Sequence, residues 1–374
     1  MAEPGSIPAF DYQRELAAYR PEIDAALARV LDSGILILGP EVKALEREFG
    51  AAVGVAQAIG VASGTDAISL ALRAIGVVPG DRIITVANTA VPTVSALRAV
   101  GAVPVFVDID PATLQISVPR LGDLLNSPGS AGVRCILPVN LHGQAADLPA
   151  IGKLAAQHNI PVVADCAQAH GTAINGRCVA QFALISCYSF YPTKNLAALG
   201  DGGMCVTDSP ALAARLCELR QYGFRGDRTA HCEGVCSRLD ELQAAVLRVR
   251  LKHFEAAQLA RQRIAMHYCQ GLADSSLTLP QAAPGTAHAW HQFVVRTPQR
   301  EVICQALQQA NIGFGIHYPL PIHLMPAYNF LGYRRGDLPH TEQASEQILS
   351  LPMFPTLRAD EVQRVIATIR SVAG

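Results

Sequence analysis

Between residues 55 and 206, short apolar runs rich in β-branched residues alternate with segments of helical period, and this alternation restricts the possible folds more than any other feature. It is typical of a parallel sheet whose strands are joined by crossover helices. The pattern therefore predicts a doubly wound α/β domain with ligands bound at the carboxyl ends of its strands. Strands are predicted at 55–62, 82–87, 103–109, 134–140, 160–166, 183–189 and 203–208, and helices at 65–76, 94–101 and 147–158.

Helical segments flank this alternating region. Pro21 begins a predicted helix that ends at Gly34, and apolar residues between positions 42 and 49 indicate a second helix. Residues 239–270 contain neither glycine nor proline and predict one long helix of the kind that joins two domains. The rest of the chain predicts a compact α+β unit, with the segments 290–297 and 313–319 and helices at 298–310, near 341–349 and at 359–373.

These segments divide the chain into two predicted domains. We expect a large α/β domain with a mostly parallel seven-stranded sheet and N-terminal helices over residues 1–250. A smaller C-terminal α+β domain is expected over residues 251–374. The chain of 374 residues is long enough for both, because a domain typically contains about 100–200 residues.

The composition excludes several classes of function. The 30 Lys and Arg residues balance 31 Asp and Glu residues, so the clustered positive charge that nucleic-acid and membrane-surface binders need is absent. No run reaches the roughly 20 apolar residues that a membrane-spanning helix requires, and no basic segment leads into an apolar run near the N-terminus. We expect a soluble, cytoplasmic protein with no membrane partner and no nucleic-acid partner.

The ten cysteines mostly lie inside apolar runs, which is typical of buried, reduced thiols rather than of a disulfide framework. His231, Cys232 and Cys236 are the one cluster with ligand-like spacing. They lack the second half of a zinc motif, so no metal site is predicted.

A phosphate-binding segment is one candidate feature of the site. Residues 63–66, with the sequence SGTD, lie between a predicted strand and a predicted helix, where backbone N–H groups can bind phosphate. An ordinary capped helix start is the alternative interpretation of this segment alone. The glycine patterns of a P-loop and of a dinucleotide-binding turn are both absent.

Two charged residues follow later strands of the same predicted sheet. Asp165 ends an apolar strand, so its carboxylate requires a cationic or hydrogen-bonding partner. Lys194 follows the strand after it and is flanked by small and apolar residues, which would lower the pKa of its amine by desolvation. A capping aspartate and a solvated surface lysine are the alternatives. Together with the phosphate-binding segment, the two residues match what pyridoxal 5′-phosphate (PLP) needs at its ring nitrogen, aldehyde and phosphate.

Several longer motifs extend this interpretation to a family. The chain closely resembles the sugar aminotransferases of the DegT/DnrJ/EryC1/StrS family, which are PLP enzymes of fold type I. The resemblance covers the chain from about Tyr19 to the C-terminus. It rests on the motifs SGTDAISLAL, VVADCAQAHGT, SFYPTKNLAALGDGGM, SRLDELQAAVL and GIHYPLPIHLMPAY.

The resemblance implies roles for individual residues. Lys194 would bind the aldehyde carbon of PLP and transfer the proton between substrate and cofactor, and Asp165 would pair with the pyridinium nitrogen. Gln168 matches the family residue beside the ring and its 3′ oxygen. His170 matches a histidine behind the aspartate, either as an orienting residue or as a packed core histidine. The residues that match the phosphate contacts are Gly64, Thr65 and Ser189.

Some positions depart from the family pattern. Ala90 stands where most relatives have an aromatic residue that stacks on the ring, and Cys236 stands where relatives usually have an asparagine that reaches the phosphate across the subunit interface. A thiol is a weak donor, so a lower affinity for the cofactor is implied. Asn140 and His142 replace commoner family residues near the expected substrate entrance.

The segment 315–328 supplies candidate contacts to the substrate. His317, Tyr318 and His323 can hydrogen-bond sugar hydroxyls or stack on apolar sugar faces. Each has a structural role as its alternative. The segment most resembles enzymes that aminate 3-keto-6-deoxyhexoses on a dTDP carrier.

The predicted function is therefore PLP-dependent transamination of a nucleotide-linked keto sugar, with L-glutamate as amino donor and 2-oxoglutarate as its product. The resemblance also implies a homodimer with active sites at the subunit interface. A 3-dehydratase of the same family would have histidine in place of Lys194. A cofactor-binding regulator without turnover is a second rival function, and a nicotinamide dehydrogenase, which the missing glycine motif disfavours, is a third.

Overall fold

The computed structural model describes residues 5–373, and its central element is a mixed sheet of seven strands. The strand order is β3-β2-β4-β5-β8-β9-β1, in which single parallel bridges join β4 to β5. Strand β9 alone runs opposite to the other six strands, so the predicted, mostly parallel sheet is confirmed. The strands are β1 (Gln57–Val61), β2 (Arg82–Thr85), β3 (Val103–Phe106), β4 (Val133–Ile136), β5 (Val163–Asp165), β8 (Ile185–Ser189) and β9 (Gly203–Thr207).

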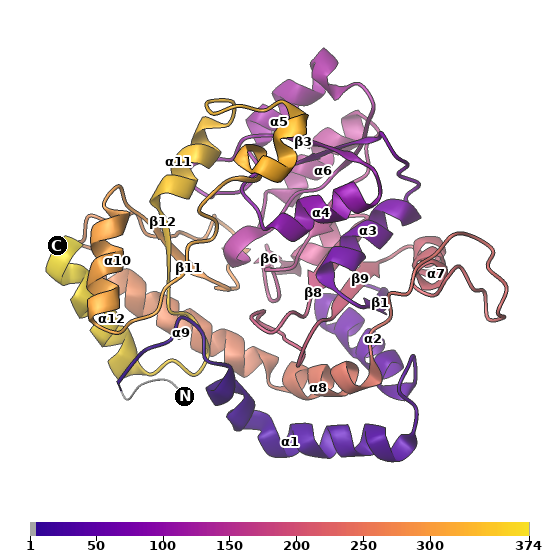
Figure 1. Ribbon diagram of the computed structural model, residues 1–374, viewed down its shortest axis with the longest axis horizontal. Helices are drawn as coiled ribbons and strands as arrows, with labels where there is room; N and C mark the ends of the chain where they lie inside the picture. The colour runs from indigo at the N-terminus through magenta and orange to yellow at the C-terminus, as the bar shows by residue number, and fades with distance from the viewer. Residues whose placement is uncertain (1–4, 374) are drawn as a thin grey trace.

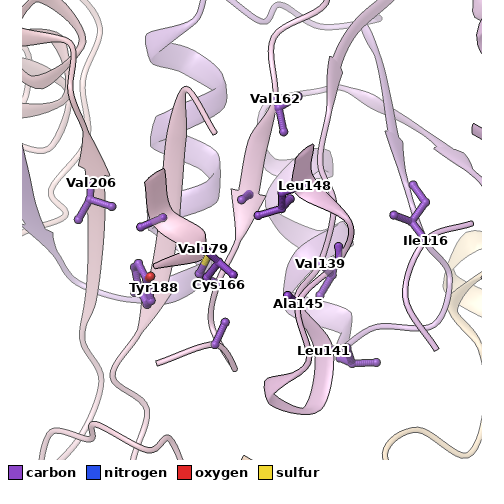
Figure 2. Close-up of a cluster of buried hydrophobic side chains, with 14 of the residues drawn as sticks. Ile116, Val139, Leu141, Ala145, Leu148, Val162, Cys166, Val179, Tyr188 and Val206 are labelled. Carbon is purple, nitrogen blue, oxygen red and sulfur yellow. The ribbon is translucent and has the colours of Figure 1, made fainter. Parts of the chain in front are cut away.

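Helices cover both faces of the sheet (Figure 1). Successive strand residues point to opposite faces, so Ile83 of β2 packs in one apolar cluster and Ile84 in another. One face is covered by α3 (Gly64–Ala74), α4 (Val91–Ala99) and α7 (Pro210–Leu219), and the other by α2 (Pro40–Val53), α5 (Val118–Leu125), α6 (Leu148–Gln157) and α8 (Glu241–Lys252). Figure 2 shows part of the second cluster, where Cys166 is buried beside Val179 and Tyr188. The doubly wound α/β fold follows from these two apolar layers.

The first helix is longer than the sequence predicts. Helix α1 (Tyr12–Ser33) begins well before Pro21, because the Asp11 side chain caps its N-terminus by accepting a hydrogen bond from the Arg14 N–H at 3.0 Å. Pro21 therefore lies inside the helix rather than at its start. It is exposed there, as is Ala17 one turn earlier, so the carbonyl group that loses its intrahelical partner can be hydrated.

The long helix predicted over 239–270 is two helices. Helix α8 ends at Lys252, and α9 (Phe254–Gly271) begins after a break at His253, which has φ −99° and ψ 4°. The His253 ring stacks on Tyr19 at 4.4 Å, and its Nε2 lies 2.8 Å from Glu22 Oε1, so α1 fixes the break. The two helices pack in different apolar clusters, α8 against α1 and α2 and α9 against α12 (Ala359–Ala373).

Residues 254–373, from α9 onward and called the C-terminal part below, contain most of a separate apolar cluster. Strand β11 (Phe293–Arg296) pairs antiparallel with β12 (Ile348–Leu351), and the helices α10 (Arg300–Gln309) and α12 pack beside them. Helix α11 (Pro339–Gln347) ends where β12 begins, so the last residues of the helix predicted near 341–349 belong to a strand. Ile7 joins this cluster and bonds through its backbone to Asn311 and Gly313. The predicted division at residue 250 stays a prediction.

Shorter elements complete the described chain. A small sheet contains β6 (Ala173–Ile174), β7 (Arg177–Cys178) and β10 (Thr286–Ala287), so β10, late in the chain, pairs with a strand that lies between β5 and β8 in the sequence. None of the helices within residues 5–373 is both long and apolar enough to cross a membrane. Short 3₁₀ helices are Pro128–Ser130, Leu141–Gly143, Val179–Phe182, Ile322–Leu324 and Pro326–Leu331.

Candidate active site

A cavity of about 550 Å³ opens where β5 and β8 end. This is the sheet edge that the strand pattern predicts for ligands. Residues from the large sheet and from the C-terminal part both line it. Of the nine predicted site residues, eight contribute to its wall: Gly64, Thr65, Asp165, Gln168, Ser189, Lys194, His317 and Tyr318.

The N-terminus of α3 lines this wall beside Ser189, and we call this group of residues the α3 cradle. The Ser63 side chain caps the helix by accepting from the Asp66 N–H at 3.1 Å, and the remaining N–H groups of the first turn have no partner within the helix. A Cβ atom on Gly64 would lie only 2.6 Å from the Ser189 Cβ, so no larger residue fits between α3 and the end of β8. The close approach brings the Ser189 hydroxyl beside the helix terminus. These groups suit a phosphate.

Asp165 is buried at the end of β5, and two hydrogen bonds orient its carboxylate. Oδ2 accepts from the Thr93 hydroxyl at 2.8 Å, and Oδ1 accepts from the Ala167 N–H at 3.0 Å. Thr93 in turn lies 2.9 Å from the Thr89 hydroxyl. Burial raises the pKa of Asp165, while the two hydrogen bonds and the nearby charge of Lys194 oppose the rise. The carboxylate is therefore prepared to pair with a cationic ligand group.

Lys194 lies in a turn after β8, where its backbone N–H donates to the Tyr191 carbonyl at 2.8 Å. Burial lowers the pKa of its amine to about 8, and the charge of Asp165 opposes the shift. An amine with this pKa is partly neutral at neutral pH and can act as a nucleophile or accept a proton. Lys194 lines the cavity and is only partly exposed, so it is not a fully solvated surface lysine.

Gln168 links the cavity wall to the C-terminal part. Its Oε1 accepts from the His142 N–H at 2.7 Å, and its Nε2 donates to the Tyr318 hydroxyl at 3.2 Å. Burial raises the pKa of Tyr318 to about 12, so the phenol stays protonated. The neighbouring His317 ring is positioned by Ser350, whose Oγ lies 2.8 Å from Nδ1.

His323 does not line the cavity, which corrects its prediction as a substrate contact. It is 1% exposed, and its Nε2 lies 3.1 Å from Glu342 Oε1. The segment 315–328 enters the cavity only with its first residues, because Ile322 and Tyr328 anchor the remainder in a separate apolar cluster.

His170 is a packed core histidine rather than an orienting one. Its ring lies among Phe49, Tyr188 and Phe190, at centroid distances of 5.0 to 6.5 Å. Neither ring nitrogen has a hydrogen-bond partner within the described residues, so no bond joins it to Asp165. Burial lowers the pKa of His170 to about 3, which keeps the ring neutral.

The departures from the family pattern have separate locations. Ala90 lines the cavity, whereas Cys236 is exposed and accepts a hydrogen bond from Arg238 at 3.1 Å. Asn140 supports the backbone behind the site, since its Nδ2 donates to the Asp165 carbonyl at 3.2 Å. Within residues 5–373, no three His, Cys, Asp or Glu side chains are placed to share a metal ion.

Sequence reasoning missed several residues that line the cavity. Thr93 lies in the first turn of α4 without a recognisable motif, and Tyr191 appears only as part of the lysine motif. His291 and Gln292 precede β11, more than 90 residues after Lys194 in the sequence. The one signal for them was the polar pair interrupting the apolar run AWHQFVV.

Curated relatives match nearly the whole chain. It is 42% identical to a dTDP-3-amino-3,4,6-trideoxy-α-D-glucose transaminase of Streptomyces venezuelae, over all of this chain and 97% of the relative. A Geobacillus stearothermophilus protein named pleiotropic regulatory protein is 39% identical over 97% of this chain and 98% of its own length. A UDP-N-acetyl-3-dehydro-α-D-glucosamine 3-aminotransferase of Acidithiobacillus ferrooxidans is 39% identical over 99% of both chains.

Solved structures match equally well. The crystal structure of S. venezuelae DesV in complex with a ketimine intermediate superposes with a TM-score of 0.94 at 41% identity, over 98% of both chains. NtdA from Bacillus subtilis with bound cofactor PMP gives a TM-score of 0.91 at 28% identity, over 99% of this chain and 86% of that one. The family model of the DegT/DnrJ/EryC1/StrS aminotransferases matches residues 18–370, and the chain therefore belongs to that family.

Proposed function

We propose that the protein is a PLP-dependent aminotransferase that converts the keto group of a nucleotide-linked deoxysugar into an amine, with L-glutamate as the amino donor. The observation on which this rests is the convergence of Lys194, Asp165 and the α3 cradle on one cavity. A nucleophilic amine, a buried carboxylate and a phosphate-binding helix terminus are the three groups that PLP requires.

Different residues of the chain have separate roles around that cofactor. PLP, when bound, supplies an aldehyde and a ring that withdraws electrons from the reacting carbon. The N-terminus of α3 and Ser189 would hold the phosphate, and Asp165 would pair with the ring nitrogen, since all of them line the cavity. The Lys194 amine, with a pKa of about 8, would take the proton from the α-carbon of the amino donor and deliver it to the cofactor carbon that receives the amine.

The relatives guide the choice of sugar. Two of them are named for amination at C3 of a nucleotide-linked hexose, one on dTDP and one on UDP. We propose a dTDP-linked 3-keto-6-deoxyhexose as the preferred substrate, and His317 and Tyr318 as residues that contact it from the C-terminal wall. Glutamate then yields 2-oxoglutarate in the first half-reaction.

We also propose a homodimer with active sites at the subunit interface. Tyr191 lines the cavity and is 51% exposed, so the wall beside Lys194 is open in the single chain. The cytoplasm is the proposed location. All ten cysteines are free thiols, as expected in a reducing compartment.

The test is the visible absorbance of the purified protein with PLP. A yellow band from lysine-bound PLP should form, disappear on addition of L-glutamate, and return when the correct keto sugar is added from a panel of dTDP and UDP derivatives. A yellow band that no amino donor removes would favour a regulator, the role in the name of one relative. Absence of the band would contradict the whole proposal.

A further inference from the structure

A buried histidine that the mechanism above does not use lines the cofactor cavity. His291 is 7% exposed and precedes β11, so it belongs to the wall that the C-terminal part contributes. Lys194 and Asp165 line the same cavity from the large sheet. A ring in this position can contact whatever the cavity binds.

Asn195 fixes the position of the proton on that ring. Its Nδ2 donates to Gln258 Oε1 at 2.9 Å and to the Ala289 carbonyl at 2.8 Å. These two bonds fix the orientation of the amide, so that Oδ1, an acceptor, faces His291 Nδ1 at 3.1 Å. The neutral ring therefore has its proton on Nδ1 and a free lone pair on Nε2.

The Nε2 lone pair is available to a ligand. Among the described residues, Nε2 has no hydrogen-bond donor, and it is not one of the enclosed unpartnered atoms. Burial, followed by the nearby charge of Lys194, lowers the pKa of His291 well below its ordinary value, so the ring stays neutral. His291 is thus a hydrogen-bond acceptor in the wall of the cavity.

We propose that His291 Nε2 accepts a hydrogen bond from a hydroxyl group of the keto sugar. The inference rests on the proposed function. Sugar hydroxyls can donate, whereas the glutamate carboxylates only accept, and the glutamate amino group is the one that is transferred. His291 therefore acts in the half-reaction with the sugar and not in the half-reaction with glutamate.

The two half-reactions can be measured separately on the PLP-loaded protein, from the loss and return of the yellow band in single turnovers. His291→Ala should slow the sugar half-reaction by about 10- to 100-fold at low substrate concentration. The glutamate half-reaction and the amount of bound PLP should not change. His291→Gln should recover part of the loss, because its Oε1 can accept near the position of Nε2.

A matched control lies on the same segment. His288 stacks on Trp290 at 4.0 Å and accepts from its N–H at 2.9 Å, but it does not line the cofactor cavity. His288→Asn keeps an acceptor near Nδ1 and should leave both half-reactions at wild-type rates. A loss in this variant equal to that of His291→Ala would show a general disturbance of the segment and would overturn the inference.

Substrates that lack one ring hydroxyl at a time complete the test. With one of these substrates, the sugar half-reaction of the wild-type protein should slow by the same factor as the His291→Ala substitution causes. The variant should react with that substrate as fast as with the complete sugar. Equal slowing of both half-reactions would instead assign His291 to proton transfer with Lys194, and unchanged rates would remove it from the site. Wild-type protein that fails to react with glutamate would contradict the proposed function rather than this inference.

Discussion

Burial acts in opposite directions on the two charged groups of the site. It lowers the pKa of Lys194 to about 8 and raises the pKa of Asp165, and the charge of each group opposes the shift of the other. An ordinary lysine is fully protonated at neutral pH. Here the fold makes the amine reactive, and the hydrogen bonds from Thr93 and Ala167 favour the ionised carboxylate.

The cofactor-free protein should react with PLP faster as the pH rises through about 8. Only the neutral amine attacks the aldehyde, and the amine is neutral above its pKa. Growth of the yellow band after rapid mixing, followed over a series of pH values, measures the rate. Lys194→Ala should form no band and show no turnover, whereas Lys153→Ala, at an exposed position on α6, should behave as wild type. A rate independent of pH would contradict the assigned pKa.

Asp165→Asn should retain some PLP but lose most of its activity. The Thr93 hydroxyl can still bond the new side chain, so the fold and the cavity survive. The neutral amide no longer stabilises a protonated ring nitrogen, and we expect both half-reactions to slow by about 100-fold or more. Bound PLP and single-turnover rates are the measurements. The exposed Asp123→Asn is the control, and near-normal rates in Asp165→Asn would mean that another group pairs with the ring nitrogen.

At the scale of single elements, the contact between α3 and β8 determines whether a phosphate can bind. In Gly64→Ala the new methyl group would lie 2.6 Å from the Ser189 Cβ, so the helix terminus must move away from the strand. Such overpacking costs about 1–3 kcal/mol, and we expect weaker PLP binding with a rate that excess PLP restores. Titration of the cofactor-free protein with PLP measures this.

Gly152→Ala is the matched control for that variant. It lies in α6 with no atom within 4 Å of the new methyl group, and alanine favours a helix over glycine by about 1 kcal/mol. Its PLP affinity should equal that of wild type. Equal affinity in Gly64→Ala would instead show that the cofactor phosphate does not depend on this contact.

The elements that could be predicted from the sequence are those whose signal is local. Seven strands and the helices α3, α4 and α6 follow from alternating apolar runs, whereas α5 was not predicted, and the site residues at strand ends follow from the sheet. The break at His253 could not be predicted, because it depends on Tyr19 and Glu22 of a distant helix. The strand β12 was hidden for the same reason, since only pairing with β11 distinguishes it from the end of α11.

The site shows the same limit. Lys194, Asp165 and Gly64 lie in motifs that can be recognised from neighbouring residues. The different locations of His291 and His323 depend on how the C-terminal part packs, which places the first in the cavity wall and the second beside Glu342. Residue type alone could not separate these two histidines.

At the scale of the whole molecule, two separate parts of the chain form the cavity wall. The large sheet supplies the amine, the carboxylate and the phosphate cradle, and the C-terminal part supplies His291, His317 and Tyr318. In the proposed reaction, groups that act on the cofactor come from the sheet, and groups that contact the sugar come from the C-terminal part. Substrate choice can therefore change through the second set without loss of the chemistry in the first.

We place the proposed subunit interface on an exposed apolar surface of the large-sheet part of the molecule. Ile35, Leu36 and Ile37 are 44–48% exposed, and Leu199 is 43% exposed. Both segments bind the first turn of α8, where the Leu36 carbonyl accepts from the Glu241 N–H at 3.1 Å and the Leu199 N–H donates to Gln243 Oε1 at 2.8 Å. Both segments therefore lie at the start of α8, and Leu199 follows the turn that contains Lys194 in the chain.

Sedimentation equilibrium should give a mass of about twice 39.7 kDa for the wild-type protein. Leu36→Lys places a charge in the proposed interface and should shift the protein towards monomer, with weaker retention of PLP because in the proposed dimer that interface completes the site. Val302→Lys, at a similarly exposed apolar position on α10, should remain dimeric. A monomeric wild-type protein would contradict the dimer itself. A dimer unaffected by Leu36→Lys would place the interface on another surface, and the open wall at Tyr191 would then face solvent during turnover.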